Sequence, residues 1–287
     1  MGPPLIQNRF QKRCAVQNSV EIAVSVDYGS PTMMSTQNAM SMSSATGKQI
    51  LSLIRSGDYA HAGEEEAIRL TLDGISPMRE RQVLDMGCGL GGTVDYISRL
   101  GLGTVSGIDI DFDTIQYATK RYPSHTFACG PAGEASRYLR PGYSLVVIFN
   151  ALYTFPDQVA ALREANILGA PNAELRVFDY TARSETPEVK AFCDRYGRGR
   201  WRPVMLDKAD DMLSRAGWKL EQVTDLSPQY ETWYGELVDK IQSKKAEIVS
   251  QHGDRWFDYA LRRYEELLEV IRDGIIGGAI FKATRTQ

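Results

Sequence analysis

An apolar, strand-like run leads directly into a cluster of glycines over residues 83–92, which read Val-Leu-Asp-Met-Gly-Cys-Gly-Leu-Gly-Gly. Glycine has no Cβ, so Gly87, Gly89 and Gly91 allow unusual backbone angles and let a ligand approach the main chain closely. A turn of this kind between a strand and a helix holds its ligand at the carboxyl edge of a sheet, beside the helix N-terminus. The spacing therefore predicts a ligand-binding turn.

Two carboxylates accompany this turn. Asp85 ends the first strand two residues before the first glycine, and Asp109 ends the next predicted strand. An acid in the second position suits the two hydroxyls of a ribose. The alternating glycines lack the third glycine of dinucleotide loops, and no Tyr-x-x-x-Lys motif is present. A nicotinamide-dependent oxidoreductase is therefore the less favoured alternative.

Short apolar runs alternate with amphipathic stretches from residue 81 onward, which is typical of βαβ units and a parallel sheet buried on both faces. The predicted strands are 82–86, 104–108, 126–128, 145–149, 175–178, 220–224 and 277–283. The predicted helices follow the glycine turn to Leu100 and cover 114–121, 158–168 and 208–216, with two amphipathic helices within 229–271. The pattern predicts one α/β domain with a helical insertion before its last strand.

Four segments follow from this pattern. Residues 1–56 form an N-terminal arm, 57–228 the cofactor-binding α/β core, 229–273 a helical cap insertion, and 274–287 the last strand of the core. The arm is polar and has no clean period of 2 or 3.6 residues in its first forty positions. Its composition favours a partly ordered arm over a lid that covers a pocket.

Composition excludes several classes of protein. The 287 residues are 43% hydrophobic and 24% charged with a net charge of −3, which argues against disorder and against a general nucleic-acid binder. No apolar run is long enough to span a membrane, and polar residues near the start argue against a secretory signal. The four cysteines form no C-x-x-C pair, and only three histidines are present. We therefore expect neither a disulfide framework nor a metal site.

The glycine turn and its acids resemble the first motif of the class I S-adenosyl-L-methionine-dependent methyltransferases, and the resemblance covers residues 81–181. It implies a doubly wound, mostly parallel seven-stranded Rossmann-like sheet with an antiparallel last strand, and S-adenosyl-L-methionine as cofactor. Asp109 would then bind the ribose, Ile110 would pack on the adenine, and Pro131 with Ala132 would face the adenine edge. Many members carry Asp where this chain has Pro131. The implied cofactor-binding residues are Tyr59, Asp85, Gly87, Cys88, Gly89, Gly91, Asp109, Ile110, Pro131, Ala132 and Asn150.

Shorter likenesses point to the phosphoethanolamine and sarcosine/dimethylglycine methyltransferases. They are the element around Tyr59, the Phe178-Asp179-Tyr180 run, Asp225-Leu226-Ser227 and the closing Phe-Lys-Ala-Thr at 281–284. The chain departs from the phosphoethanolamine enzymes at their Tyr–His pair, because the two positions fall near Ser43 and Thr154. The resemblance therefore implies a small-molecule acceptor and leaves amine, hydroxyl and carbon acceptors open.

Four side chains are candidate catalytic groups: His61, Tyr153, Asp179 and Tyr180. His61 titrates near neutrality when free, so it is either a base or, by a small margin, a hydrogen-bonded residue beside the cofactor carboxylate. Tyr153 lies over the sulfonium or packs in the core. Asp179 and Tyr180 end a strand, where ligands of open α/β sheets bind.

Two further groups of residues have both a binding and a structural interpretation. The arginines bind an anionic group of the substrate or form a solvated basic loop, which we favour. The aromatic side chains pack in the core, which is more common, or roof the pocket. The arginines are Arg195, Arg198 and Arg200, and the aromatic residues are Tyr230, Trp233 and Tyr234.

We therefore expect a cytoplasmic enzyme that transfers a methyl group from S-adenosyl-L-methionine to a small molecule, with an amine nitrogen as the favoured acceptor. O- or C-methylation of a small metabolite, which can be anionic, and a non-catalytic cofactor-binding protein are the alternatives. We expect no nucleic-acid or membrane partner and no metal. A homodimer is compatible with the sequence.

Overall fold

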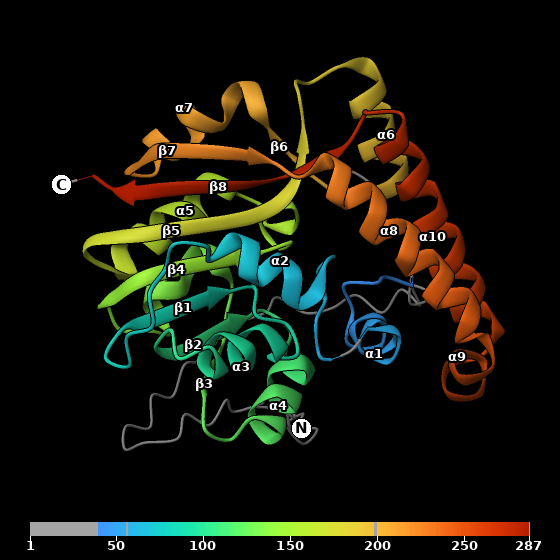
Figure 1. Ribbon diagram of the computed structural model, residues 1–287, viewed down its shortest axis with the longest axis horizontal. Coiled ribbons are helices and arrows are strands. Elements are labelled where there is room, and N and C mark those ends of the chain that lie inside the picture. The colour runs from blue at the N-terminus through green and yellow to red at the C-terminus, as the bar shows by residue number, and fades with distance from the viewer. Residues whose placement is uncertain (1–39, 56, 198–199, 287) are drawn as a thin grey trace, which may run out of the picture. The chain divides into compact units, whose positions relative to one another are not determined.

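The computed structural model describes residues 40–55, 57–197 and 200–286 (Figure 1). Most of the predicted N-terminal arm, residues 1–39, lies outside the described residues. The α-helices are α1 (Ala45–Ile54), α2 (Glu64–Thr71), α3 (Gly92–Arg99), α4 (Phe112–Arg121), α5 (Gln158–Leu168), α6 (Pro187–Gly197), α7 (Ala209–Arg215), α8 (Ser227–Ser243), α9 (Lys245–His252) and α10 (Asp254–Arg272). Short 3₁₀ turns are η1 (Ala132–Arg137), η2 (Leu152–Thr154) and η3 (Leu206–Lys208).

One sheet organises these helices, and its order is β3-β2-β1-β4-β5-β8-β7, with the short β6 paired to β5. Its strands are β1 (Gln82–Met86), β2 (Thr104–Asp109), β3 (Thr126–Cys129), β4 (Tyr143–Phe149), β5 (Gly169–Ala182), β6 (Val204–Met205), β7 (Trp218–Asp225) and β8 (Gly277–Arg285). β8 runs antiparallel to both β5 and β7, while the other pairs are parallel. The predicted Rossmann-like methyltransferase fold is confirmed.

Four local expectations need correction. The sheet has an eighth, two-residue strand, β6, that pairs with the end of β5. β5 spans Gly169–Ala182 and is far longer than the predicted 175–178. The predicted pair of helices within 229–271 is three helices, because Gly253 adopts φ +86 between α9 and α10. α4 begins at Phe112 because the Asp111 side chain accepts a hydrogen bond from Thr114 N and so caps the helix.

Alternate strand residues face two cores, as expected for a sheet buried on both sides. On β1, Val83 packs into a core with α2, α3, α8 and α10, whereas Leu84 packs into a second core with α5 and α7. On β4, Val147 packs into the first of these cores and Ile148 into the second. The sheet is therefore held rigidly between helices, and its carboxyl edge forms a fixed platform.

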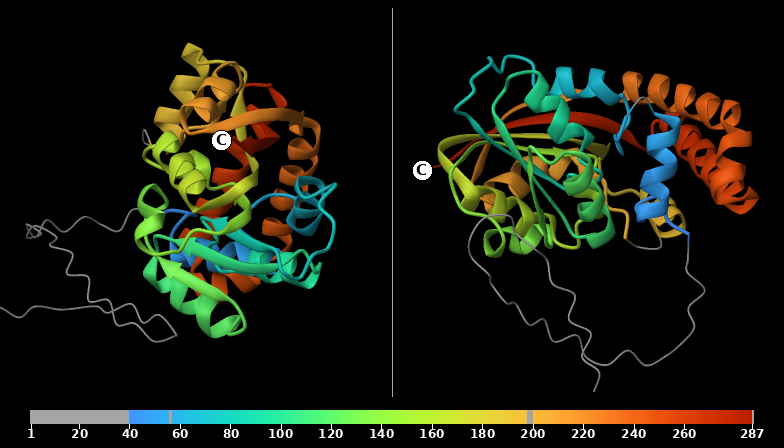
Figure 2. Two further views of the ribbon diagram at one scale, coloured as in Figure 1. Left: turned by 90° about the vertical axis from the view of Figure 1, so that its left-hand side faces the viewer. Right: turned by 90° about the horizontal axis from the view of Figure 1, so that it is seen from below.

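The helical insertion runs from the end of β7 to the start of β8. Figure 1 and the right-hand view of Figure 2 show α8 and α10 side by side, extending past the sheet, with α1 next to them. Throughout residues 40–55, 57–197 and 200–286, no helix combines the length and apolar character needed to cross a membrane. The same residues contain no cluster of three His, Cys, Asp or Glu side chains that suits a metal ion.

Gly278 on β8 lies directly under the Tyr230 ring of α8, and a Cβ there would overlap the ring. We expect Gly278→Ala to lower the free energy of unfolding by about 1–3 kcal/mol, because overpacking forces the ring aside. Gly235→Ala is the matched control, since Gly235 lies within α8 with no atom near its Cβ position. That change should stabilise the chain by about 0.5–1 kcal/mol. Denaturant unfolding of both variants tests the packing; equal effects would contradict it.

Candidate functional site

The glycine turn lies where the strand order reverses, because the chain leaves β1 for β2 on one side and later returns to β4 on the other. Crevices for ligands form at such a reversal, outside the carboxyl ends of the strands. The turn is tied to the neighbouring strand: Gly87 N and Cys88 N both donate to Ile108 O, at 2.8 and 3.1 Å. β1 and β2 therefore fix where the turn stands.

The three glycines of the turn are required for different reasons, although all have positive φ. A Cβ at Gly87 would overlap Ala151, and a Cβ at Gly91 would lie 2.9 Å from the Phe127 ring. A Cβ at Gly89 would meet no atom within 4 Å. Packing accounts for the first and last glycines, whereas the space beside Gly89 is open. This open space is where a ligand can approach the backbone.

Asp109 closes one side of this space, and its carboxylate is fully hydrogen-bonded. Oδ1 accepts from Asp111 N at 3.0 Å, and Oδ2 accepts from Gly89 N at 3.0 Å. Lys48 Nζ, from α1, reaches both oxygens at 3.2 and 3.1 Å. A carboxylate offers about four acceptor positions, and these contacts occupy all of them. A ribose can therefore bind to Asp109 only if Lys48 gives way.

Asp85, near the end of β1, is buried and lies close enough to Asp109 for their charges to interact. Its Oδ1 has no hydrogen-bond partner within the described part of the chain. Burial and the negative charge of Asp109 raise the pKa of Asp85 to about 8. An unpaired buried carboxyl group is unfavourable, so this atom fits a ligand that brings a donor, such as an ammonium group.

Asn150 follows β4 and faces the same edge. Its backbone has φ +44, an uncommon angle for a residue other than glycine, and its N–H donates to Phe178 O at 2.7 Å. Its Oδ1 accepts from Tyr230 OH at 3.0 Å, and its buried Nδ2 has no partner among the described residues. A second polar atom is thus free for a ligand.

The residues expected around the adenine lie beyond Asp109. Ile110 is 70% exposed, an uncommon state for a large apolar side chain, and is available to pack on a ring. Pro131 caps the short turn η1 and Ala132 begins it. The neighbouring Gly130 N donates to Asp109 O at 3.0 Å, which fixes η1 beside β2. We call the turn at Gly89, with Asp85, Asp109 and Asn150 around it, the cofactor cradle. The structure therefore brings Ile110, Pro131 and Ala132 to the Asp109 end of this cradle.

His61 is buried and its ring is committed on both sides. Nδ1 lies 3.0 Å from Ala62 O, so it carries the proton, and Nε2 accepts from Thr93 Oγ1 at 3.1 Å. Burial lowers the pKa of His61 to about 4, so the ring is neutral at pH 7. Tyr59, also buried, lies 5.6 Å away and donates to Glu65 at 3.3 Å. His61 has no ring nitrogen left to accept a substrate proton.

The carboxylate of Asp179 accepts four backbone N–H groups. Ala151, Leu152 and Tyr153 donate to Oδ2 at 3.1, 2.8 and 3.4 Å, and Tyr180 donates to Oδ1 at 2.7 Å. Burial raises the pKa of Asp179 to about 7, while these hydrogen bonds oppose the shift. Asp179 is thereby placed to hold η2 against β5, which is a positioning role.

Tyr153 and Tyr180 belong to an aromatic cluster above the ends of β4 and β5. The centroids of their rings are 4.8 Å apart, and the ring centroid of Trp201 is 4.9 Å from that of Tyr180. The Tyr180 and Tyr234 hydroxyls are hydrogen-bonded to each other. Burial raises the pKa of the Tyr153 and Tyr180 hydroxyls, so both stay protonated at pH 7. The cluster offers ring faces and neutral hydroxyls next to Asn150.

Sequence reasoning missed Lys48 and the bond from Tyr230 to Asn150. A usable signal for Lys48 existed, since a lysine three residues before Leu51 lies on the apolar face of a helix. The arginines that could have bound an anion as the less favoured alternative do not converge among the described residues: Arg195 pairs with Glu266 at 2.8 Å and Arg200 is exposed. Arg198 lies outside the described residues.

Comparisons with known proteins agree with this geometry. Residues 83–172 match the family model described as a methyltransferase domain. The fold is similar to phosphoethanolamine N-methyltransferase 2 of Haemonchus contortus, at 18% identity and TM-score 0.74, over 85% of this chain and 58% of that one. It is also similar to a putative sarcosine dimethylglycine methyltransferase of Galdieria sulphuraria, at 15% identity and TM-score 0.67, over 77% of this chain and 82% of that one. A third similar structure is the cyclopropane synthase MmaA2 of Mycobacterium tuberculosis, at 15% identity and TM-score 0.67, over 76% of this chain and 82% of that one.

The strand order and the turn at its reversal point are those of the Rossmann-like methyltransferase fold. The glycine turn lies at the start of the segment that matches the methyltransferase domain model. It spans about 58% of the length of the Haemonchus contortus enzyme. These similarities establish the fold, while the chemistry must be argued from the site.

The open space beside Gly89 can be tested by filling it. We expect Gly89→Ala to weaken binding of S-adenosylhomocysteine by about tenfold or more, because the methyl group takes up the space where a ligand meets the backbone. Gly74→Ala is the matched control: Gly74 has φ +82 and nothing within 4 Å of its Cβ position, but lies after α2. Both changes cost similar backbone strain, so only binding should separate them. Equal affinities in calorimetry would make Gly89 a structural turn residue only.

The contact between Lys48 and Asp109 predicts competition with the ribose. We expect Lys48→Met to tighten S-adenosylhomocysteine binding by about tenfold, because a charge-assisted hydrogen bond no longer has to be broken. It should also lower the melting temperature of the free chain, since Asp109 is left buried without its cation. Lys208→Met, which removes an exposed pair with Glu185, should change neither quantity. Weaker binding by the Lys48 variant would mean that Lys48 helps to hold the ligand.

Proposed function

We propose that the chain binds S-adenosyl-L-methionine and transfers its methyl group to a small-molecule acceptor, with an amine nitrogen favoured. The observation that carries the proposal is the open space beside Gly89, whose N–H donates to Asp109, together with the unpaired Oδ1 of Asp85 near the end of β1. A Haemonchus contortus relative with this fold binds S-adenosylhomocysteine and phosphomonomethylethanolamine.

The residues present fit such a cofactor. Asp85 would take its ammonium group, Asp109 its ribose hydroxyls, and Ile110 with the Pro131–Ala132 turn its adenine. The free Nδ2 of Asn150 would add a donor on the methionine side. When bound, the cofactor supplies an electrophilic methyl group on its sulfonium. The polar atoms left unpaired by the protein are thus of the kind that this ligand satisfies.

The site residues support an acceptor that needs no strong base. His61 is neutral with both nitrogens engaged, and the carboxylate of Asp179 is taken up by backbone N–H groups. An amine brings its own lone pair, whereas a hydroxyl or a carbon acid must first lose a proton. An apolar surrounding lowers the pKa of an amine and so favours its neutral form.

The contribution of the protein would then be placement and exclusion of water. Asp179 fixes η2, and Tyr230 fixes the Asn150 side chain, so the wall next to the reacting atoms is rigid. The rings of Tyr153, Tyr180 and Trp201 surround this wall. Aromatic faces attract cations, and an N-methylated product becomes a cation.

The proposal extends to the compartment in which the protein acts, the cytoplasm, and to the kind of molecule it binds. Cys88 and Cys193 form no disulfide bond within the described residues, which suits the reducing conditions of the cytoplasm. The net charge of −3 supports small-molecule acceptors over nucleic acid.

Binding and turnover test the proposal separately. Calorimetry should show binding of S-adenosylhomocysteine in preference to NADH. Methyl-labelled cofactor incubated with pooled amines, hydroxy compounds and acidic carbon compounds should label the amine pool. Labelling of the hydroxyl or carbon pool alone would replace the amine by O- or C-methylation. Cofactor binding without transfer to any pool would indicate a non-catalytic binding protein, and absence of binding would reject the proposal.

The raised pKa of Asp85 predicts a pH dependence. If its carboxylate pairs with the cofactor ammonium, binding requires loss of the proton, so affinity should rise by up to about tenfold per unit from about pH 6 to 8. The free energy of unfolding of the ligand-free chain should fall as the pH rises from 3.8 to about 8. The reason is that the pKa of Asp85 in the folded state lies above its ordinary value, so the folded chain holds a proton that the unfolded chain has lost. Asp85→Asn should flatten both profiles, as measured by calorimetry and thermal unfolding. An unchanged binding profile in that variant would remove Asp85 from the cofactor site.

A further inference from the structure

The phenol of Tyr230, on α8, reaches from the helical insertion to the end of β4. Its hydroxyl donates to Asn150 Oδ1 at 3.0 Å, and the two residues are 80 positions apart in the sequence. Asn150 belongs to the cofactor cradle, whereas α8 belongs to the insertion between β7 and β8. This hydrogen bond therefore lets a residue of the insertion act on a side chain of the cradle.

The ring of Tyr230 is held from several sides. It is fully buried and lies over Gly278 of β8, where a Cβ would overlap it. The ring centroids of Phe178 and Tyr180 are 5.4 and 5.5 Å away. A close-packed ring cannot turn without displacing its neighbours. The hydroxyl of Tyr230 therefore has one fixed place next to Asn150.

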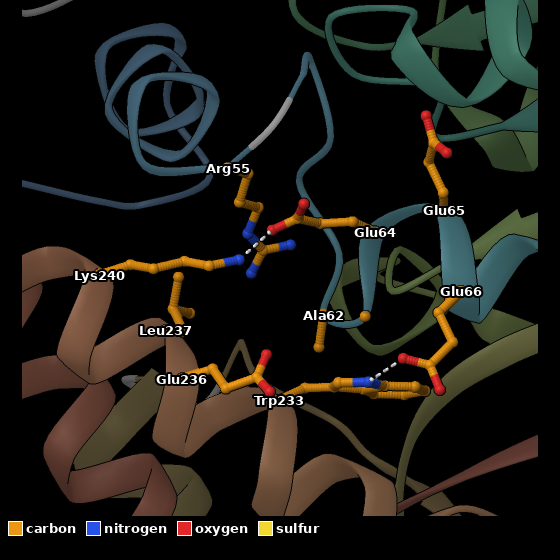
Figure 3. A pocket seen from close by; sticks show the side chains of 10 residues that line it. Arg55, Ala62, Glu64, Glu65, Glu66, Trp233, Glu236, Leu237 and Lys240 are labelled. Carbon is orange, nitrogen blue, oxygen red and sulfur yellow. Dashed lines mark hydrogen bonds and ion pairs between the residues drawn. The ribbon is translucent and has the colours of Figure 1, made fainter.

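α8 itself is held by other hydrogen bonds, which join it to α2 (Figure 3). Trp233 Nε1 donates to Glu66 at 2.9 Å, and Lys240 Nζ donates to Glu64 Oε1 at 3.0 Å. These bonds and the packed ring fix the helix without the hydroxyl of Tyr230. Removal of the hydroxyl alone should therefore leave α8 in place, so that its effect on the site can be measured separately.

Asn150 has little freedom to adjust its backbone. Its φ is +44, and its N–H donates to Phe178 O, on the neighbouring strand β5, at 2.7 Å. Asparagine adopts positive φ more readily than most residues other than glycine. Because the backbone is fixed, the orientation of the side-chain amide depends on the partner of its oxygen, which is Tyr230.

The hydrogen bond also decides which end of the Asn150 amide is left for a ligand. Burial raises the pKa of the Tyr230 hydroxyl, so its proton is present at pH 7. Donation to Oδ1 uses this proton and leaves Nδ2 unpaired among the described residues. A flipped amide would pair Nδ2 but leave the hydroxyl proton and Oδ1 without partners. The flipped orientation is therefore less favourable, and Asn150 offers N–H groups to a ligand.

We propose that Tyr230 is a positioning residue that holds the Asn150 amide so that Nδ2 donates to an oxygen of the ligand in the cofactor cradle. The proposal rests on the proposed function. In S-adenosyl-L-methionine the matching oxygen is in the carboxylate, because the ribose would bind at the Asp109 end and the ammonium group accepts no hydrogen bond. A residue of the insertion thereby contributes to binding of the amino-acid part of the cofactor.

Two ligands separate this role from general damage to the cradle. Tyr230→Phe keeps the ring over Gly278 and frees the Asn150 amide, so S-adenosylhomocysteine should bind about tenfold more weakly in calorimetry. 5′-Methylthioadenosine lacks the amino-acid part, so its affinity should not change. Tyr143→Phe is the matched control, because it removes another buried hydroxyl, bonded to Ser106, at the opposite end of β4. Equal weakening of both ligands by Tyr230→Phe would overturn the proposal.

A double-mutant cycle tests whether Tyr230 acts through Asn150. Asn150→Gly suits the positive φ and removes the amide. In that variant, Tyr230→Phe should cause no further loss of S-adenosylhomocysteine affinity, since coupled residues are not additive. The same loss with and without the amide would make Tyr230 a packing residue only.

A second variant tests the donor directly. Asn150→Asp keeps the acceptor for Tyr230 and replaces the donor by an oxygen, so it should weaken S-adenosylhomocysteine more than Tyr230→Phe does. Unchanged affinity in this variant would also overturn the proposal, whatever the stability of the Tyr230 variant.

Failure of this proposal can be told apart from failure of the proposed function. If the unaltered chain binds neither S-adenosylhomocysteine nor 5′-methylthioadenosine, the proposed function is wrong. If it binds both and Tyr230→Phe leaves the ratio of the two affinities unchanged, the cofactor site stands and the positioning role of Tyr230 is rejected.

Discussion

The carboxylate of Asp109 is the interaction on which the site depends. It joins three segments that lie far apart in the sequence: the turn at Gly89, the start of α4 at Asp111, and α1 through Lys48. Its negative charge also contributes to the high pKa of Asp85 across the cradle. The backbone of the turn, the position of α1 and the protonation of the neighbouring acid are therefore coupled. A change in what Asp109 binds alters all three.

The site keeps polar atoms buried and unpaired, at a cost to the stability of the chain. Asp85 Oδ1 and Asn150 Nδ2 are such atoms within the described residues. Each lacks a partner in a region where other groups are well satisfied; Asp179, for example, accepts four backbone N–H groups. A fold optimised for stability alone would replace or pair these atoms. Both atoms lie at the carboxyl edge of the sheet, one near the end of β1 and the other just after β4.

The sheet and the cofactor turn could be predicted because their signals are local. Strand and helix periods reveal β1 and α3, and the glycines with Asp85 and Asp109 lie close together in sequence. Lys48 is 61 residues from Asp109, so no short-range pattern connects them. Asp179 is similar in type and position to a catalytic acid, and only the folded η2 turn shows that backbone N–H groups occupy it. The break between α9 and α10 depends on one glycine, Gly253, and the hydrophobic periodicity of the segment does not reveal it.

The helical insertion has a consequence for how specificity can vary. α8 leaves from β7 and α10 returns to β8, and these strands are neighbours paired antiparallel. Both ends of the insertion are thus anchored to one rigid hairpin, far from β1 and β2. α8 is also held along its length by bonds from Tyr230 to Asn150, Trp233 to Glu66 and Lys240 to Glu64, so the part of the insertion beyond these contacts is the part that can change length or lining without touching the cofactor turn. The architecture therefore lets α9 and the outer ends of α8 and α10 diverge while the turn at Gly89 is preserved.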